Sequence, residues 1–119
     1  MENKSVAEKI KKDCMALLNN KMIMNNQSGE ITDEYKQLYA YKQVLVVVTN
    51  EELVSTARLF LQNNLNITQA SKKGYMHRNT LIYRIDKIKR LIGLDIRNYA
   101  EAVVFENLVM FYDVIKHNK

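Results

Sequence analysis

The scarcity of helix-breaking residues limits the possible folds of this chain more than any other feature. Its 119 residues include no proline and only three glycines, Gly29, Gly74 and Gly93. Sandwiches and barrels need these residues at their many turns, so their scarcity favours long helices. We therefore expect an all-α protein. Hydrophobic residues make up 47% of the chain, which is enough to bury a core in one domain of this size.

Cysteine usage and hydropathy exclude several classes of protein. Cys14 is the single cysteine and cannot form an internal disulfide. Charged residues are scattered through the first 20 positions, where a signal peptide has a continuous apolar segment. The densest apolar run, residues 44–48, is far shorter than the roughly 20 residues that cross a bilayer. These features predict a cytoplasmic protein without a membrane span.

Positive charge is concentrated in one part of the chain. Residues 1–50 have a net charge of +1, whereas residues 72–97 contain eight Lys or Arg and two Asp, a net charge of +6. A local excess along one helix is typical of proteins that bind nucleic-acid phosphates. An ordinary solvated helix face can have the same composition, so charge alone leaves both readings open.

The first 48 residues are interpreted as an N-terminal helical arm or dimerisation region. Residues 5–20 are predicted to form an amphipathic helix and residues 25–29 a turn, with a second helix from residue 32 to about residue 48. The β-branched run at 44–48 also suits a short strand, but no second strand lies near it. Tyrosines and methionines here are expected in the core or an interface: Tyr35, Tyr39, Tyr41, Met15, Met22 and Met24.

Residues 49–119 are predicted to form a helix-turn-helix domain. Thr49 and Glu52 match a capping box and predict a helix that ends near residue 63. Asn66 can cap a short helix over residues 67–73, and residues 74–76 can turn the chain before a helix over 78–92. Ala70 and Gly74 are small where the helices must approach, and glycine can adopt a positive φ in the turn. A final apolar helix is expected over residues 98–117.

The helix over residues 78–92 has two contrasting faces. Leu81, Ile85, Ile88 and Ile92 form an apolar stripe that predicts a buried side. The first turn of a recognition helix reads base edges in the major groove. The candidates for base contacts are Arg78, Asn79, Thr80, Tyr83 and Arg84. The candidates for phosphate contacts are Lys72, Lys73, His77, Lys87, Lys89 and Arg90. Tyr83 suits core packing equally well, and His77 suits helix capping.

The same residues resemble a known family. The strings are Asn66-Ile67-Thr68-Gln69-Ala70, then Met76-His77-Arg78-Asn79-Thr80-Leu81-Ile82-Tyr83-Arg84-Ile85, then Leu91-Ile92-Gly93-Leu94-Asp95-Ile96. They resemble the C-terminal helix-turn-helix of PucR-type regulators of purine catabolism and sugar diacids, over about residues 53–111. The resemblance implies a Fis-like, PucR-type fold and a transcription factor whose recognition helix begins at His77.

Two departures limit what this resemblance implies. The family usually has a larger apolar residue where this chain has Gly74, so the turn is expected to be looser. Full-length members place a ligand-sensing region before this domain, whereas about fifty helical residues precede it here. We therefore expect no small-molecule effector pocket within this chain and transfer neither purines nor sugar acids to it.

No set of residues suggests catalysis or metal binding. His77, His117 and Cys14 are too few and too dispersed for a metal site, and no glycine-rich phosphate loop occurs. We expect no enzyme activity, no cofactor and no metal. The leading hypothesis is a homodimeric, sequence-specific regulator that binds double-stranded DNA. The alternatives are an architectural DNA binder and a protein-interaction or anti-regulator module that keeps the helix-turn-helix as a scaffold.

Overall fold

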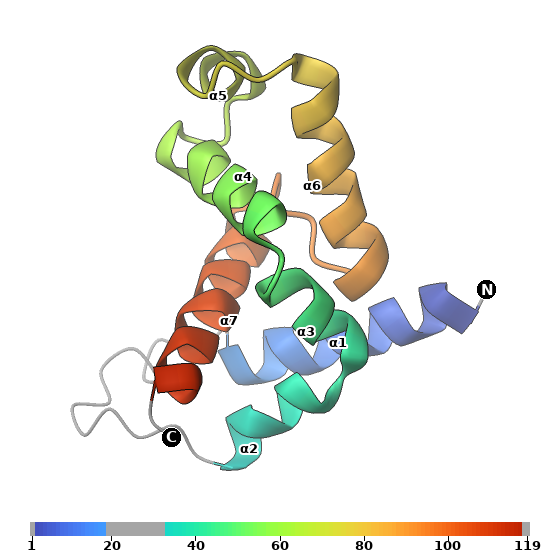
Figure 1. The fold of residues 1–119 in the computed structure, drawn as a ribbon. Coiled ribbons are helices and arrows are strands. Elements are labelled where there is room, and N and C mark those ends of the chain that lie inside the picture. The colour runs from blue at the N-terminus through green and yellow to red at the C-terminus, as the bar shows by residue number, and fades with distance from the viewer. Residues whose placement is uncertain (1, 19–32, 118–119) are drawn as a thin grey trace.

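The computed structural model describes residues 2–18 and 33–117, and every element within these ranges is helical (Figure 1). This confirms the all-α prediction. The elements are α1 (Glu2–Leu18), α2 (Asp33–Lys36), the 3₁₀ helix η2 (Gln37–Ala40), α3 (Lys42–Val48), α4 (Glu51–Gln62), α5 (Ile67–Lys73), α6 (Arg78–Ile92) and α7 (Tyr99–His117). The turn predicted at residues 25–29, and Met22 and Met24, lie outside the described residues.

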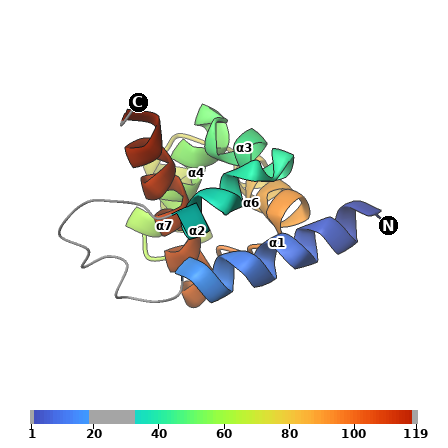
Figure 2. The same ribbon diagram turned by 90° about the horizontal axis from the view of Figure 1, so that it is seen from below.

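One hydrophobic core joins both halves of the chain. Leu81, Ile85, Ile88 and Ile92 on α6 are completely buried, as the apolar stripe predicted. The same cluster contains residues of α1 and α7, among them Ile10, Cys14, Leu18, Val104 and Leu108. Figure 2 shows α1 crossing beneath the other helices. The division at residue 48 remains a prediction, but α1 contributes to the core that supports α6.

Polar contacts attach α1 to the C-terminal half of the chain. Lys11 Nζ lies 3.2 Å from the carboxylate of Glu101, which is itself buried. The side-chain amide of Asn107 donates a hydrogen bond to the Leu18 carbonyl oxygen over 3.0 Å. Burial raises the pKa of the Cys14 thiol to about 12, with a smaller contribution from the charge of Asp13. Cys14 is therefore an uncharged core residue at neutral pH.

The segment before α4 differs from the sequence prediction in two details. Residues 33–48 form a broken series of short helices, because Tyr41 adopts extended angles (φ −71°, ψ 124°) that interrupt the predicted single helix. Its hydroxyl donates to Asp13 Oδ2 over 2.6 Å, which attaches this break to α1. Residues 44–48 are helical, so helix was the correct choice over strand.

The second difference is the cap of α4. The predicted capping box at Thr49 is wrong by one residue, because Asn50 is the N-cap and its side chain accepts from the Leu53 amide over 3.0 Å. Thr49 instead ends α3, and its hydroxyl donates to the Leu45 carbonyl. Asparagine and threonine are both good caps, so sequence preference alone did not separate two adjacent candidates.

A candidate nucleic-acid interface

The helices α4, α5 and α6 form the helix-turn-helix unit, and side-chain caps fix where the last two begin. Asn66 Oδ1 accepts from the Gln69 amide over 2.9 Å and starts α5, as predicted. His77 Nδ1 accepts from the Asn79 amide over 3.0 Å and starts α6. This interaction confirms the capping role predicted for His77. The first turn of α6 therefore begins where the sequence placed it.

The turn between α5 and α6 is a Schellman motif. The Met76 amide donates to the Ser71 carbonyl over 3.0 Å, and the Tyr75 amide donates to the Lys72 carbonyl over 3.3 Å. The Ser71 hydroxyl also donates to the Met76 carbonyl. These bonds close the turn at both ends and set the direction in which α6 leaves it.

The left-handed residue at the centre of this turn is not the glycine that the sequence suggested. Gly74 has an ordinary φ of −91°, whereas Tyr75 adopts the left-handed φ of 50°. The predicted positive φ at Gly74 is therefore wrong. The lack of a Cβ at this position instead leaves space for the end of the Leu59 side chain on α4, which a Cβ would overlap. The prediction that small residues lie where the helices approach each other is confirmed, because Ala70 is completely buried.

The first turn of α6 presents polar side chains to solvent. Arg78 and Asn79 are exposed, and Thr80 is partly buried. The guanidinium of Arg78 donates to Thr68 Oγ1 over 3.2 Å, which directs this side chain across α5. Arg78 and Asn79 are thus both exposed to solvent, with one guanidinium nitrogen of Arg78 bonded to Thr68, and their base contacts remain predictions.

The structure places Arg84 differently from the other candidates. Its Nη1 donates to Thr56 Oγ1 over 3.1 Å, and its Nη2 lies 3.3 Å from Glu52 Oε2, so it joins α6 to α4. The Arg84 side chain is only 23% exposed, and Thr56 is buried. To read a base, Arg84 would first have to leave these partners. Glu52 and Thr56 were not among the predicted site residues, because contacts between helices leave no periodic pattern in the sequence.

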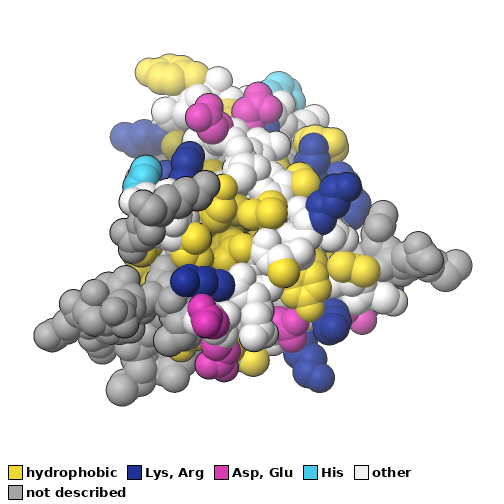
Figure 3. Space-filling view, turned by 60° about the horizontal axis from the view of Figure 1, so that its bottom comes forward, with side chains coloured by type: hydrophobic (Ala, Val, Ile, Leu, Met, Phe, Trp, Pro, Cys, Tyr) yellow, Lys and Arg dark blue, Asp and Glu magenta, His cyan; other side chains and the backbone are white. Residues whose placement is uncertain are grey.

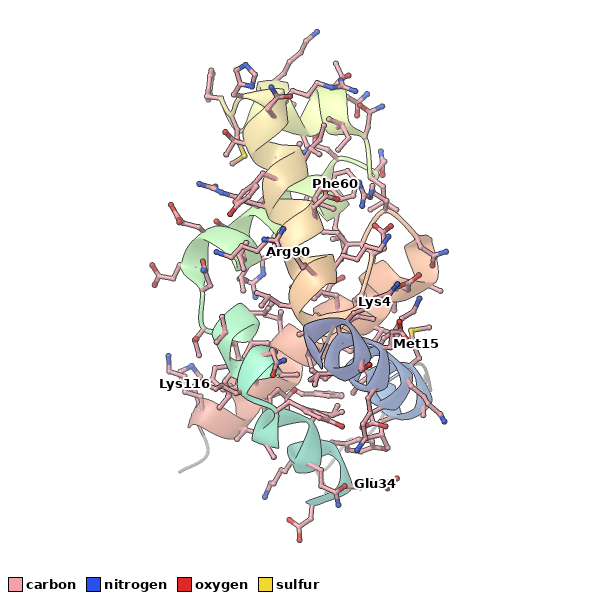
Figure 4. All side chains as sticks on the ribbon, turned by 90° about the vertical axis from the view of Figure 1, so that its right-hand side faces the viewer. Lys4, Met15, Glu34, Phe60, Arg90 and Lys116 are labelled. Atoms are coloured by element: carbon pink, nitrogen blue, oxygen red, sulfur yellow. The ribbon has the colours of Figure 1, made fainter. Side chains whose placement is uncertain are left out.

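The outer face of α6 carries an aromatic and a basic residue in contact. Tyr83 is 56% exposed, and the Arg90 guanidinium lies 5.9 Å from the centre of its ring, within the range of a cation–π interaction. Figure 4 views the molecule from the side of α6 and shows Arg90 on this helix. Tyr83 is thus a surface residue and not part of the core, and its contact with DNA remains a prediction.

The candidate phosphate contacts fall into two groups. Lys72 and Lys73 are exposed in the last turn of α5, next to the turn that leads into α6. On α6, Lys87 is partly buried and Arg90 is exposed. Lys89 is exposed but lies 3.7 Å from Asp95, so its charge is partly compensated. These basic residues therefore lie at the end of α5 and in the second half of α6.

The segment after α6 fixes the end of this helix. Gly93 adopts a φ of 80°, and a Cβ there would overlap the carbonyl oxygen of Ala7 on α1. Arg97 contacts Asp86 and Asp95, each over 2.8 Å, and so attaches this segment to α6. Asp86 and Asp95, the two acidic residues of the segment 72–97, are therefore both paired within it, and the net charge of +6 already includes them.

No helix within the described part of the chain has the length and apolar character needed to span a membrane. The described residues also bring no three His, Cys, Asp or Glu side chains into a cluster that could hold a metal ion.

Comparison with known proteins finds proteins of Bacillus subtilis that are similar to part of this chain. The chain is 38% identical over 72 residues to uncharacterized protein YxkF of Bacillus subtilis, which is 60% of this chain and 24% of that protein. It is 33% identical over 49 residues to the purine catabolism regulatory protein of Bacillus subtilis, which is 41% of this chain and 9% of that protein. No solved structure gives a significant match.

The chain therefore spans less than a quarter of the length of these curated relatives. The profile of the PucR C-terminal helix-turn-helix domain, a DNA-binding domain, matches residues 53–107, which contain most of α4, all of α5 and α6, and the start of α7. The capped helices, the closed turn and the buried stripe of α6 lie within this match. Residues 53–107 are thus a PucR C-terminal helix-turn-helix domain.

Proposed function

We propose that this protein is a sequence-specific transcriptional regulator that inserts α6 into the major groove of double-stranded DNA. The observation that carries the proposal is the pair of opposite faces on α6. Its apolar stripe is buried, while Arg78 and Asn79 are exposed in its first turn. Arginine can donate two bonds to guanine and asparagine can bond to both adenine edge atoms, which gives this turn the chemistry for base recognition.

Basic residues beside the turn support the same orientation. Lys72 and Lys73 lie in the last turn of α5. Cations at the C-terminal end of a helix interact favourably with its dipole, also in the free protein. On DNA these side chains can contact the phosphates that flank the groove, which position the protein without reading sequence. A regulator of this kind would act in the cytoplasm and would need no catalytic group. The cytoplasmic location and the lack of enzyme activity remain predictions.

A homodimer is part of the proposal. Two copies related by a two-fold axis would place their recognition helices in half-sites one DNA turn apart, and the operator would be a palindrome. Leu45 and Val46 on α3 support an interface, since they are 37% and 43% exposed. Figure 3 shows a patch of hydrophobic side chains near the centre of the lower face, with charges of both signs around it.

Fluorescence anisotropy with random duplexes and with duplexes enriched by selection tests this function. We expect a selected palindrome to bind about 10³-fold or more tightly than random DNA. Arg78→Ala should weaken binding to the palindrome by about ten-fold or more, because one base contact is lost. Lys116→Ala, at the opposite end of the molecule from the first turn of α6 (Figure 4), is the control and should change little.

Other outcomes would contradict the proposal in different ways. Tight binding with equal affinity for all sequences would indicate an architectural DNA binder, and no binding at moderate salt would indicate a protein-interaction module. Sedimentation of the free protein and of Val46→Glu would test the dimer, since a buried charge at the interface should dissociate it. A monomer that still binds a single half-site specifically would remove only the homodimer from the proposal.

A further inference from the structure

Tyr75 combines two features that the fold does not require. It is 98% exposed, the highest value among the large hydrophobic residues that are exposed in the structure, and its φ is 50°. This φ belongs to the left-handed region, which is unfavourable for residues with a Cβ and favours glycine. A bulky residue in this conformation, with its side chain in solvent, gains nothing from packing in the free protein.

The position of Tyr75 within the Schellman motif makes a tyrosine there still more unusual. Tyr75 is the first residue after the C-cap Gly74, which is the position where helices most often use glycine. The chain does contain a glycine here, but one residue earlier, where φ is −91° and the side chain of Leu59 lies close. The turn would therefore form more easily with a smaller residue at position 75.

The motif also holds Tyr75 in a defined place. The backbone on both sides is fixed by the bonds from the Tyr75 amide to the Lys72 carbonyl and from the Met76 amide to the Ser71 carbonyl. The exposed Lys72 and Lys73 precede it, and His77 begins α6 just after it. Tyr75 is thus presented by a rigid turn, beside basic side chains, at the entrance to the proposed recognition helix.

We infer that Tyr75 is a DNA contact whose hydroxyl donates a hydrogen bond to a phosphate next to the groove that α6 enters. This inference rests on the proposed function and adds a residue to the binding surface. Tyrosine hydroxyls are among the groups that bind DNA phosphates. The bond is neutral on the protein side, so it releases no counterion, unlike the contacts of Lys72 and Lys73. It also carries no sequence information.

These properties give Tyr75 a signature that a lysine contact does not share. Tyr75→Phe keeps the ring and the backbone preference and removes only the hydroxyl. We expect it to weaken binding to the selected palindrome and to random DNA by the same factor, about three- to ten-fold. The slope of log K against log salt should not change, whereas Lys72→Ala should reduce its steepness by about one.

Two further variants separate binding from folding. Tyr75→Gly should raise the midpoint of thermal unfolding, because glycine adopts the left-handed φ freely, and should weaken DNA binding at least as much as Tyr75→Phe. Tyr99→Phe is the matched control, since Tyr99 is an exposed tyrosine (75%) at the start of α7. It should leave DNA affinity unchanged.

The outcomes distinguish this inference from the proposed function. If the unmodified protein binds DNA and Tyr75→Phe binds as tightly as Tyr99→Phe, the contact is absent and the inference alone fails. A change in the salt slope or in the ratio of specific to random affinity in Tyr75→Phe would also overturn it. If the unmodified protein binds no DNA at all, the proposed function fails and this inference fails with it.

Discussion

At the scale of single residues, the two glycines of the described chain occupy their positions for different physical reasons. Gly93 needs both its left-handed φ of 80° and the space that α1 leaves at the Ala7 carbonyl. Gly74 has an ordinary φ, and its neighbour is the end of the flexible Leu59 side chain. Backbone strain and a rigid neighbour are costly to accommodate, whereas a flexible side chain can move.

We therefore predict unequal effects of adding one methyl group. Gly93→Ala should lower the free energy of unfolding by about 2 kcal/mol or more, since the left-handed φ alone costs about 1–2 kcal/mol for a residue with a Cβ. Gly74→Ala should lower it by about 1 kcal/mol or less, because a slight overpacking is offset by reduced entropy of the unfolded chain. Urea unfolding of both variants measures the difference. Equal losses would contradict the close approach of α1 to Gly93.

At the scale of secondary-structure elements, Arg84 connects the recognition helix to α4. Its bonds to Thr56 and Glu52 span the two helices. Arg90 lies on the same helix, is exposed, and lies over the exposed ring of Tyr83 on its own helix. The two arginines therefore offer a matched pair, in which one supports the position of α6 and the other does not.

Replacing each of them with methionine should separate these roles. Arg84→Met should lower the free energy of unfolding by about 1 kcal/mol, because it breaks charge-assisted hydrogen bonds in a partly buried site. Arg90→Met should change it by less than about 0.5 kcal/mol. Both should weaken DNA binding, Arg84→Met through the position of α6 and Arg90→Met through a lost phosphate contact. If Arg84→Met kept full stability and lost preference at one base pair, the base contact predicted from the sequence would be its main role.

At the scale of the whole molecule, α1 and the helix-turn-helix share one core. Ile10 and Leu18 are buried in the cluster that contains the stripe of α6, and Lys11 and Leu18 contact Glu101 and Asn107. An element packed in this way supports the orientation of α6. The predicted alternative, a separable N-terminal arm, would leave residues 49–119 folded without it.

We predict that Ile10→Ala in the intact chain lowers the free energy of unfolding by about 2–5 kcal/mol, because the cavity opens in a fully buried site. Lys9→Ala, a change at the exposed neighbour, should have little effect. We also expect a fragment of residues 49–119 to lose cooperative thermal unfolding, as followed by circular dichroism. A fragment that unfolds cooperatively, together with a small effect of Ile10→Ala, would support the separable arm.

Much of the fold followed from local rules. The buried face of α6 was predicted because Leu81, Ile85, Ile88 and Ile92 repeat at helical intervals, and this pattern depends only on neighbours along the chain. The caps Asn66 and His77 were found for the same reason, since each acts on an amide two or three residues away. The matched PucR domain also followed from three short strings of residues, at 66–70, 76–85 and 91–96.

The remaining features depend on contacts between residues far apart in the sequence. The break at Tyr41 brings its hydroxyl to Asp13, and the partners of Arg84 lie on another helix. The left-handed φ falls on Tyr75, the residue after the C-cap, whereas Gly74 packs against Leu59 of another helix. The sequence alone therefore determined the helices and the polar face of α6, because these are local properties. Only the tertiary structure decided which polar side chains are already paired and which remain exposed, because that depends on packing between helices.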